Sequence, residues 1–248
     1  MERFVRTQAL LGAENWQRLQ ECRITIIGMG AVGSYATEAL CRSGVGSLRL
    51  VDFDTVSISN INRQLYALSS TLNRPKVEVA AERVQDINPD CRVEALQSFV
   101  HTDTLDAVLD SRPDLVIDAI DSVTPKVALL RGVWERQIPL LSSMGAALRT
   151  DPTRISLGDI MDTSGCPLAR AVRTRLRRQG IGRGITCVYS TEPVSFHYGS
   201  AGRDGTQRTI NRGLERNVLG SLPTLTGIFG LMLANQAIKL LTSYHLQD

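Results

Sequence analysis

Short apolar runs alternate along this chain with longer segments whose apolar positions have helical spacing. We expect strands at residues 24–27, 48–51, 92–96, 115–117 and 139–145. The first run reads ITII, and an apolar, β-branched run of this kind is typical of a buried parallel strand. Between the strands, Val77, Ala80, Ala81 and Val84 mark one face of a helix. Strands that alternate with helices predict an α/β fold with a doubly wound, mostly parallel sheet.

Two further helices are expected in the second half of this core. Residues 101–110 have the composition of a polar helix, and residues 125–137 that of a helix with Val127, Leu130 and Trp134 on its apolar side. Between and after them, Asp118, Asp121 and Ser142 fall at the carboxyl ends of expected strands, the edge where ligands of such sheets collect.

The same pattern predicts one domain, 1–248, made of three parts. These are an N-terminal helical segment, a core that holds the parallel sheet, and a C-terminal strand, loop and helix extension, at residues 1–20, 21–150 and 151–248. In the extension, strands are expected at 154–160 and 185–191, with a helix at 168–179 between them. Residues 197–216 are rich in Gly, Ser and Arg without periodicity, which predicts a loop.

One apolar stretch, residues 222–241, is long enough to raise the question of a membrane. It contains Pro223 and is interrupted by Asn235, Gln236 and Lys239. A membrane-spanning helix needs about 20 nearly uncharged residues. We therefore expect a buried core helix, no membrane insertion and, because the N-terminal residues lack an apolar signal region, a cytoplasmic protein.

A glycine-rich turn follows the first expected strand. Gly28, Gly30 and Gly33 form GxGxxG at the point where the strand gives way to a helix, and Asp52 ends the next strand 19 positions after Gly33. In Rossmann-like folds such glycines allow a tight turn, backbone approach to a phosphate and close packing of helix on sheet, while the acid binds a ribose hydroxyl. The helix N-terminus also favours an anion. The sequence therefore predicts a nucleotide site.

The residues that follow Asp52 indicate which nucleotide is bound. Asn60, Arg63, Gln64 and Lys76 cluster in sequence behind the ribose acid. A dinucleotide enzyme does not need this group, whereas a triphosphate requires cations and polar donors along its tail. This pattern favours ATP over NAD.

Composition adds two observations. The net charge is only +3, but of the 28 lysines and arginines only Lys76, Lys126 and Lys239 are lysines. The arginine excess is compatible with two explanations, genome composition and contacts to nucleic-acid phosphates. The five cysteines include no CxxC pair, so we expect no structural zinc site and a reducing compartment.

The motifs resemble those of a known superfamily. The segments DFDTVSISNINRQ, PKVE and VIDAIDS are similar to those of the E1-like adenylating enzymes, the superfamily of MoeB and ThiF. INPDCRV, VIDAIDSVTPK and CVYSTE are similar to the tRNA threonylcarbamoyladenosine dehydratase family within it. The resemblance covers about residues 3–241 and is weakest between 193 and 220.

The resemblance assigns roles to individual residues. It implies that Asp121 binds Mg²⁺ with Asp54, and that Arg6 reaches the ATP of a partner subunit in a homodimer. Arg63, Lys76 and Asp121 would be the catalytic residues. The nucleotide-binding residues would be Arg6, Gly28, Gly30, Gly33, Asp52, Asp54, Asn60, Arg63, Gln64 and Lys76.

The resemblance also implies a ligase-type reaction. The threonyl carboxylate of the modified adenosine in tRNA would attack the α-phosphate of ATP, and the urea oxygen would then close onto the acyl-adenylate with release of AMP. Because the nucleophile is intramolecular, proximity supplies much of the rate. No protein nucleophile is needed, and Cys187 in CVYSTE is expected to be a buried structural thiol. The arginines of residues 173–183 and of the following loop are expected to bind the tRNA, with Arg170, Arg173 and Arg177 as a stripe on one helical side and Arg203, Arg208 and Arg212 in the loop.

Two alternatives from other classes remain at this point. One is an activator of a ubiquitin-like sulfur carrier of the MoeB or ThiF type, which shares the ATP site but usually carries two CxxC pairs. The other is a non-catalytic or NAD-binding module, which Arg63, Lys76 and Asp121 argue against. A sulfur-transfer partner such as a cysteine desulfurase is a further expected contact of this superfamily.

Overall fold

A single twisted sheet runs through the centre of the molecule. The computed structural model describes residues 2–110, 112–194 and 219–242. Within these residues the sheet has seven strands in the order β3-β2-β1-β4-β5-β7-β6. In chain order they are β1 Arg23–Ile27, β2 Ser47–Val51, β3 Arg92–Leu96, β4 Leu115–Asp118, β5 Leu140–Ser143, β6 Ile155–Asp159 and β7 Thr186–Ser190. Neighbouring strands are parallel except for β6, which is antiparallel to β7.

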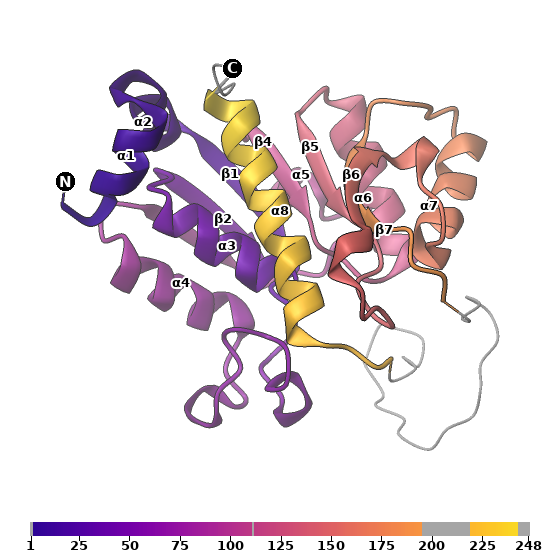
Figure 1. Cartoon of the computed structure of the whole chain (residues 1–248), viewed down its shortest axis with the longest axis horizontal. Helices are drawn as coiled ribbons and strands as arrows, with labels where there is room; N and C mark the ends of the chain where they lie inside the picture. The colour runs from indigo at the N-terminus through magenta and orange to yellow at the C-terminus, as the bar shows by residue number, and fades with distance from the viewer. Residues whose placement is uncertain (1, 111, 195–218, 243–248) are drawn as a thin grey trace.

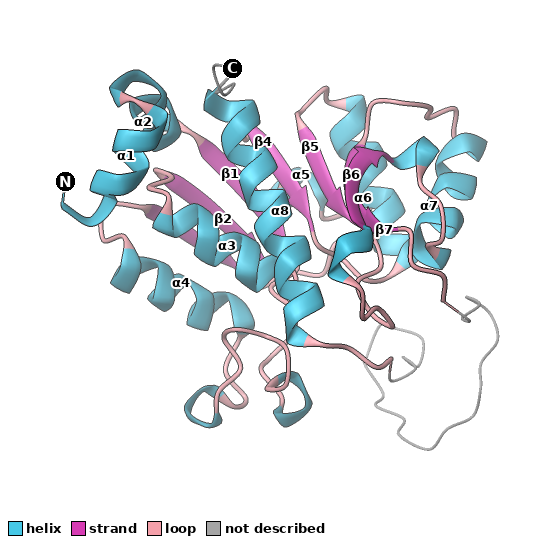
Figure 2. Cartoon of the chain, viewed as in Figure 1, coloured by secondary structure: helices cyan, strands magenta, loops and turns pink. Residues whose placement is uncertain are grey.

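Helices cover both faces of the sheet (Figures 1 and 2). The α-helices in the described residues are α1 Val5–Leu11, α2 Ala13–Glu21, α3 Gly33–Arg42, α4 Lys76–Ile87, α5 Leu105–Val108, α6 Val123–Glu135, α7 Pro167–Arg178 and α8 Pro223–Thr242. Helices α3, α4 and α8 pack on one face, and α5, α6 and α7 on the other. This is the predicted doubly wound, mostly parallel α/β fold with a C-terminal extension.

Strand β1 shows why the central runs are apolar throughout. Ile24 and Ile26 belong to the core beneath α3, α4 and α8, whereas Ile27 belongs to the core beneath α5 and α6. Successive side chains of a strand point to opposite faces. When helices cover both faces, side chains on both sides of the strand are buried, so the strand is apolar throughout and does not alternate with polar residues.

The C-terminal helix α8 crosses the face of the sheet beside α3 (Figure 1). By length and composition it could span a membrane, yet Leu225, Phe229 and Leu233 are buried in the core. The close approach depends on Gly230, because a Cβ there would lie 2.4 Å from the carbonyl oxygen of Val32. One face of α8 is thus a core face, as expected, while Leu231 is exposed.

Two local expectations differ from the structure. Of residues 101–110 only α5 is helical, because Thr104 accepts a hydrogen bond from the His101 amide and ties the preceding residues into a turn. Trp134 lies toward the same core as Val127 and Leu130, but it is 43% exposed because it borders a cavity next to Leu140 and Ile185. The expected loop at 197–216 lies outside the described residues.

Candidate active site

The glycine-rich turn connects β1 to α3 at the carboxyl edge of the sheet. Gly28 has φ +94°, and a Cβ there would lie 2.8 Å from the carbonyl oxygen of Ala119. A Cβ at Gly33 would lie only 1.7 Å from the carbonyl oxygen of Gly28. Both positions therefore require glycine. The turn aims the N-terminus of α3 at the edge where ligands of such sheets collect.

Asp52 holds this turn from the end of β2. Its carboxylate accepts hydrogen bonds from the backbone N–H of Met29 at 2.7 Å and of Asp54 at 2.8 Å. Burial raises the pKa of Asp52 above its usual range, although Lys76 and the two backbone bonds act in the opposite direction. Each carboxylate oxygen has a second lone-pair site, so the geometry leaves Asp52 able to accept a ribose hydroxyl.

Asp54 and Lys76 form an ion pair next to the turn. Lys76 begins α4, and its Nζ lies 3.1 Å from Oδ2 of Asp54. The ammonium is buried, and the backbone N–H of Lys76 donates to the carbonyl of Asp54 at 3.1 Å. The pair fixes the lysine at the carboxyl edge, where it is one of the predicted triphosphate contacts.

The loop after β2 carries the other predicted triphosphate residues. Gln64 is buried and faces the glycine-rich turn, since its Nε2 lies 3.8 Å from the position of a Cβ at Gly30. Arg63 donates to the carbonyl of Ser59 at 2.9 Å, and Asn60 accepts from the Ser57 amide at 3.1 Å. Thus Gln64 is brought to the turn, whereas the Arg63 and Asn60 side chains bond within their own loop.

Asp121 lies in the loop that follows β4, and it is exposed. Residue Ala119 of the same loop contacts Gly28, which places this loop against the glycine-rich turn. Among the described residues there is no group of three or more His, Cys, Asp or Glu side chains placed to hold a metal ion. Mg²⁺ in nucleotide sites is usually held by one or two carboxylates together with phosphates. An accessible carboxylate at this edge fits that requirement, whereas Asp54 is already paired with Lys76.

A buried polar cluster lies beneath the Asp121 loop. Lys126 of α6 places its Nζ 2.5 Å from Oδ2 of Asp118 and 2.9 Å from the carbonyl oxygen of Ser143. Ser142 Oγ donates to the same Asp118 oxygen at 2.6 Å. Asp118 and Ser142 lie at strand ends as expected, but the sequence analysis missed Lys126. The available signal was a lysine within an apolar helical face, beside Val127 and Leu130.

Cys187 is buried near the start of β7. Burial raises the pKa of its thiol to about 12. A thiol in this state is a poor nucleophile, because the thiolate is the reactive form. This agrees with the expected structural role.

Arg6 is exposed on α1, far from the glycine-rich turn of its own chain. The neighbouring Arg3 donates to the carbonyls of Asp86 and Ile87 at the C-terminal end of α4. Lys76 begins the same helix, and its 12 residues place the two ends about 17 Å apart. In Figure 1, α1 lies at the opposite edge of the sheet from the turn.

The expected arginine stripe on α7 is only partly exposed. Arg173 turns inward, where its Nη1 donates to the carbonyl of Thr163 at 2.8 Å. Burial, followed by the charges of Arg177 and Arg170, lowers its pKa below the usual range. Arg170 and Arg177 are exposed as expected, and Arg175 and Arg178 are exposed as well, with Arg175 donating to the Thr124 hydroxyl at 2.9 Å. These arginines form a cluster of like charge.

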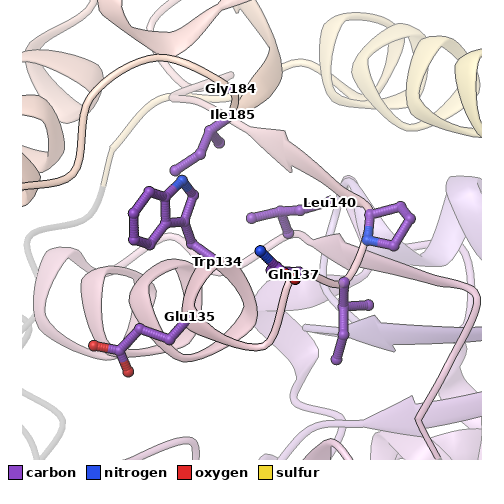
Figure 3. A pocket seen from close by; sticks show the side chains of 8 residues that line it. Trp134, Glu135, Gln137, Leu140, Gly184 and Ile185 are labelled. Atoms are coloured by element: carbon purple, nitrogen blue, oxygen red, sulfur yellow. The ribbon is translucent and has the colours of Figure 1, made fainter.

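A cavity in the described residues lies away from the carboxyl edge. It has a volume of about 460 Å³ and lies at the amino ends of β5 and β7, between Trp134, Leu140 and Ile185 (Figure 3). The glycine-rich turn, Asp52 and Asp121 all lie at the carboxyl ends of strands. This cavity is therefore separate from the candidate active site.

Comparisons with known proteins agree with this geometry. The ThiF family profile matches residues 3–248. The tRNA threonylcarbamoyladenosine dehydratase of Bacillus subtilis is 45% identical over 192 residues, 77% of this chain and 76% of the relative. The enzyme of that name from Escherichia coli is 36% identical over 249 residues, 96% of this chain and 92% of the relative.

Solved structures give the same result. The crystal structure of the Escherichia coli tRNA N6-threonylcarbamoyladenosine dehydratase TcdA in complex with ATP has a TM-score of 0.86 at 35% identity. The alignment covers 98% of this chain and 94% of that one. The molybdopterin-synthase adenylyltransferase of Escherichia coli is more distant, at 31% identity over 92% of this chain and 76% of the relative.

Proposed function

We propose that this chain, which belongs to the ThiF family, catalyses the ATP-dependent dehydration of N6-threonylcarbamoyladenosine in tRNA. The observation that carries the proposal is the similarity, along nearly the whole chain, to a dehydratase whose structure contains ATP. The glycine-rich turn, Asp52 and Lys76 meet at the carboxyl edge of the sheet, where nucleotides bind in folds of this kind. The protein is thus an enzyme of the ligase type that forms AMP and pyrophosphate.

In this proposal the residues of the turn and its two flanking loops bind ATP. The backbone of Gly28, Gly30 and Gly33 approaches the phosphates, and Asp52 accepts a ribose hydroxyl. Lys76 and Arg63 neutralise charge that moves onto pyrophosphate, and Asn60 and Gln64 add polar contacts. The loop bonds of Arg63 to Ser59 would be exchanged for phosphate oxygens.

Mg²⁺ would be held by Asp121, with Asp54 as a second ligand only if its ion pair with Lys76 opens. The bound ion would neutralise charge on the phosphates. Lys76 would then be free to contact the triphosphate, so binding of Mg²⁺ by Asp54 and binding of the triphosphate by Lys76 would favour each other. Asp121 is exposed at the same edge, where an ion that arrives with the nucleotide can reach it.

The proposed reaction has two steps. A threonyl carboxylate oxygen bonds to the α-phosphorus, and pyrophosphate leaves. The urea oxygen of the same side chain then bonds to the activated carbonyl carbon, the C–O bond to AMP breaks, and a urea N–H proton is lost. The product is cyclic, and one carboxylate oxygen leaves with AMP. The protein supplies orientation and charge stabilisation, and Cys187 takes no part.

The tRNA itself would lie along α7. Arg170, Arg177 and Arg178 are exposed on this helix, and the charges of Arg177 and Arg170 contribute to the lowered pKa of Arg173, which is a sign of mutual repulsion. A polyanion relieves this repulsion. Phosphate contacts position an RNA, while selection of the modified base must come from the active site.

The assembly and location form the rest of the proposal. A homodimer would bring Arg6 of one subunit to the ATP of the other, and the exposed position of Arg6 on α1 supports this arrangement. A cytoplasmic location matches a tRNA substrate. Because no sulfur is transferred in the dehydration, a cysteine desulfurase partner is not needed for turnover, and its docking stays a prediction.

The proposal is tested by incubation of the purified protein with ATP, Mg²⁺ and tRNA that carries the threonylcarbamoyl group. We expect nucleoside mass spectrometry to show loss of one water from the modified adenosine. An unchanged nucleoside, together with pyrophosphate exchange that depends on a ubiquitin-like sulfur carrier, would favour the MoeB-type alternative instead.

A further inference from the structure

Lys126 is a buried cation that the reaction itself does not use. Its side chain, like that of Asp118, is 0% exposed. The ammonium contacts Asp118 Oδ2 at 2.5 Å, the Ser143 carbonyl at 2.9 Å and Ser142 Oγ at 3.4 Å. These three partners are polar groups at the carboxyl ends of β4 and β5.

Burial of the Lys126–Asp118 ion pair is energetically unfavourable. Removing two charges from water costs several kcal/mol per ion before their attraction is counted, so a buried ion pair is weak evidence of a stabilising role. Apolar side chains of similar volume are often as stable at such a position. The location of Lys126 therefore calls for an explanation other than stability.

The explanation lies in what Asp118 holds. While its Oδ2 faces Lys126 and Ser142, its Oδ1 accepts the backbone N–H of Ile120 at 3.0 Å. This bond folds the chain back directly after β4, on the path to Asp121. One carboxylate thus links the buried ammonium to the loop that carries the proposed metal ligand.

The same loop forms a wall of the glycine-rich turn. The Ala119 amide donates to the carbonyl of Ile27 at 2.8 Å, and the Ala119 carbonyl lies 2.8 Å from the Cβ position of Gly28. A small movement of residues 118–121 would shift both this wall and Asp121. Lys126 is the cation that fixes the loop from beneath.

We propose that Lys126 is a positioning residue for the MgATP site, acting through Asp118 on the loop that carries Asp121. This inference rests on the proposed function, because it requires that Asp121 serves the nucleotide. Misplacement of a reacting group by about 1 Å can cost about 100-fold in rate. Loss of the Lys126–Asp118 ion pair should therefore weaken MgATP binding and turnover without removing any group that touches ATP.

The central experiment compares Lys126→Met with wild type by calorimetric titration of MgATP and by pyrophosphate release per folded molecule. We expect the Kd for MgATP to rise at least about tenfold and kcat/KM to fall by about 10- to 100-fold. Leu129→Ala is the matched control. Leu129 is buried on the same helix but in the core against β4 and α5, so this variant should lower Tm and leave the Kd unchanged.

A second variant separates positioning from the loss of a charge. In Asp118→Asn/Lys126→Met no unpaired buried carboxylate remains, and the Asn Oδ1 can still accept the Ile120 amide. We expect this double variant to recover part of the MgATP affinity. If Lys126→Met does not fold, Ser142→Ala removes one of the bonds to Asp118 and should raise the Kd in the same direction, by a smaller factor.

The inference is wrong if folded Lys126→Met binds MgATP within about twofold of wild type while its Tm falls as in Leu129→Ala. It is also wrong if the double variant recovers Tm but no affinity. MgATP binding needs no tRNA, so this outcome differs from a failure of the proposed function, in which wild-type protein binds MgATP and forms no cyclic nucleoside.

Discussion

The side chains at the carboxyl edge of the sheet differ in how firmly neighbouring groups hold them. Asp52 is fixed by two backbone amides, and Lys76 by Asp54. Asp121 is exposed at the same edge. Their positions were predictable from the sequence because each follows a strand or begins a helix, whereas the metal and catalytic roles were implied by the resemblance to the E1-like enzymes.

Other residue roles could not be predicted in this way. Lys126 and Asp118 are eight positions apart and meet only because α6 folds back beneath the end of β4. Arginine is usually a surface residue, yet the Arg173 guanidinium donates hydrogen bonds to the carbonyls of Thr163 and Ile160 and is partly buried. Trp134 has an apolar position on α6 but borders an open cavity. Such roles depend on tertiary neighbours that spacing along one element does not specify.

Substitution of Asp121 or Lys76 tests the charge-bearing residues. We expect Asp121→Ala and Lys76→Ala each to lower ATP-dependent pyrophosphate release by about 100-fold or more, because each would remove a charge that the proposed function assigns to the MgATP site. Glu14→Gln is the control, since Glu14 forms an exposed pair with Arg18 on α2. Normal pyrophosphate release from either alanine variant would exclude that residue from the catalytic set.

Gly33 tests the glycine-rich turn. In Gly33→Ala the new methyl group would meet the backbone carbonyl of Gly28 at 1.7 Å, so the turn must move. We expect a loss of about 1–3 kcal/mol in stability and of ATP binding. Gly182→Ala is the matched control, because a Cβ there has no neighbour within 4 Å. Denaturant unfolding and ATP titration measure both effects, and a Gly33→Ala protein that binds ATP normally would contradict the phosphate-cradle role.

At the scale of elements, the alternation of strands and helices was predictable because the sheet is covered on both faces. The apolar runs identified the central strands, and the helical face at Val77, Ala80 and Val84 identified α4. The ends of the helices were harder to predict, as in the short α5, where the hydrogen bonds of the Thr104 side chain compete with helix formation. Local hydrogen bonding of this kind leaves little trace in hydrophobic periodicity.

Glu38 ties two elements together and makes their packing pH-dependent. Burial raises the pKa of this α3 carboxyl, but hydrogen bonds from Arg83 of α4 and from Arg42 outweigh it, so the pKa lies below the usual 4.5. A lowered folded-state pKa means that the stabilisation is present above pH 4.5 and is lost as the pH falls through the folded-state value.

We expect Glu38→Gln to lose about 1 kcal/mol of stability at neutral pH, because hydrogen bonds to a charged group stabilise but solvent around the half-exposed arginines screens them. The difference from wild type should shrink as the pH falls below 4.5. Chemical denaturation at neutral and at acidic pH measures it. A difference that is the same under both conditions would show that the effect does not come from the ionised carboxylate.

Helix α7 makes a prediction about RNA. Arg170→Ala/Arg177→Ala/Arg178→Ala should weaken tRNA binding and lower the salt slope by about 0.7–0.9 for each phosphate that the variant no longer neutralises. Arg173→Ala should instead lower Tm, because Arg173 bonds to the carbonyl of Thr163. Arg131→Ala on α6 is the control, since Arg131 is exposed and paired with Glu135. Equal affinity and slope in the triple variant and wild type would place the RNA surface elsewhere.

At the scale of the whole molecule, the fold separates the parts of the proposed ATP site. Arg6 belongs to α1, which lies at the opposite edge of the sheet from the glycine-rich turn (Figure 1), and so it can serve ATP only across a subunit interface. The parallel core was predictable from the sequence, whereas the periodicity of one chain does not determine whether or how two copies would meet.

Subunit mixing tests this arrangement. We expect Arg6→Ala and Asp121→Ala homodimers each to be nearly inactive. A mixed dimer has one site with an intact Asp121 and an Arg6 from the other subunit. Mixing the two variants under conditions of subunit exchange should therefore restore activity. If the mixture stays as inactive as its components while wild-type subunits exchange normally, Arg6 does not act across the interface.

The central claim is that the threonyl carboxylate is activated as an acyl-adenylate and then captured by its own urea group. The most direct measurement uses tRNA whose threonyl carboxylate is labelled with heavy oxygen, followed by mass spectrometry of the AMP and the nucleoside. The account predicts that one labelled oxygen passes to AMP while the other stays in the cyclic nucleoside. AMP without label, formed together with the dehydrated nucleoside, would contradict it.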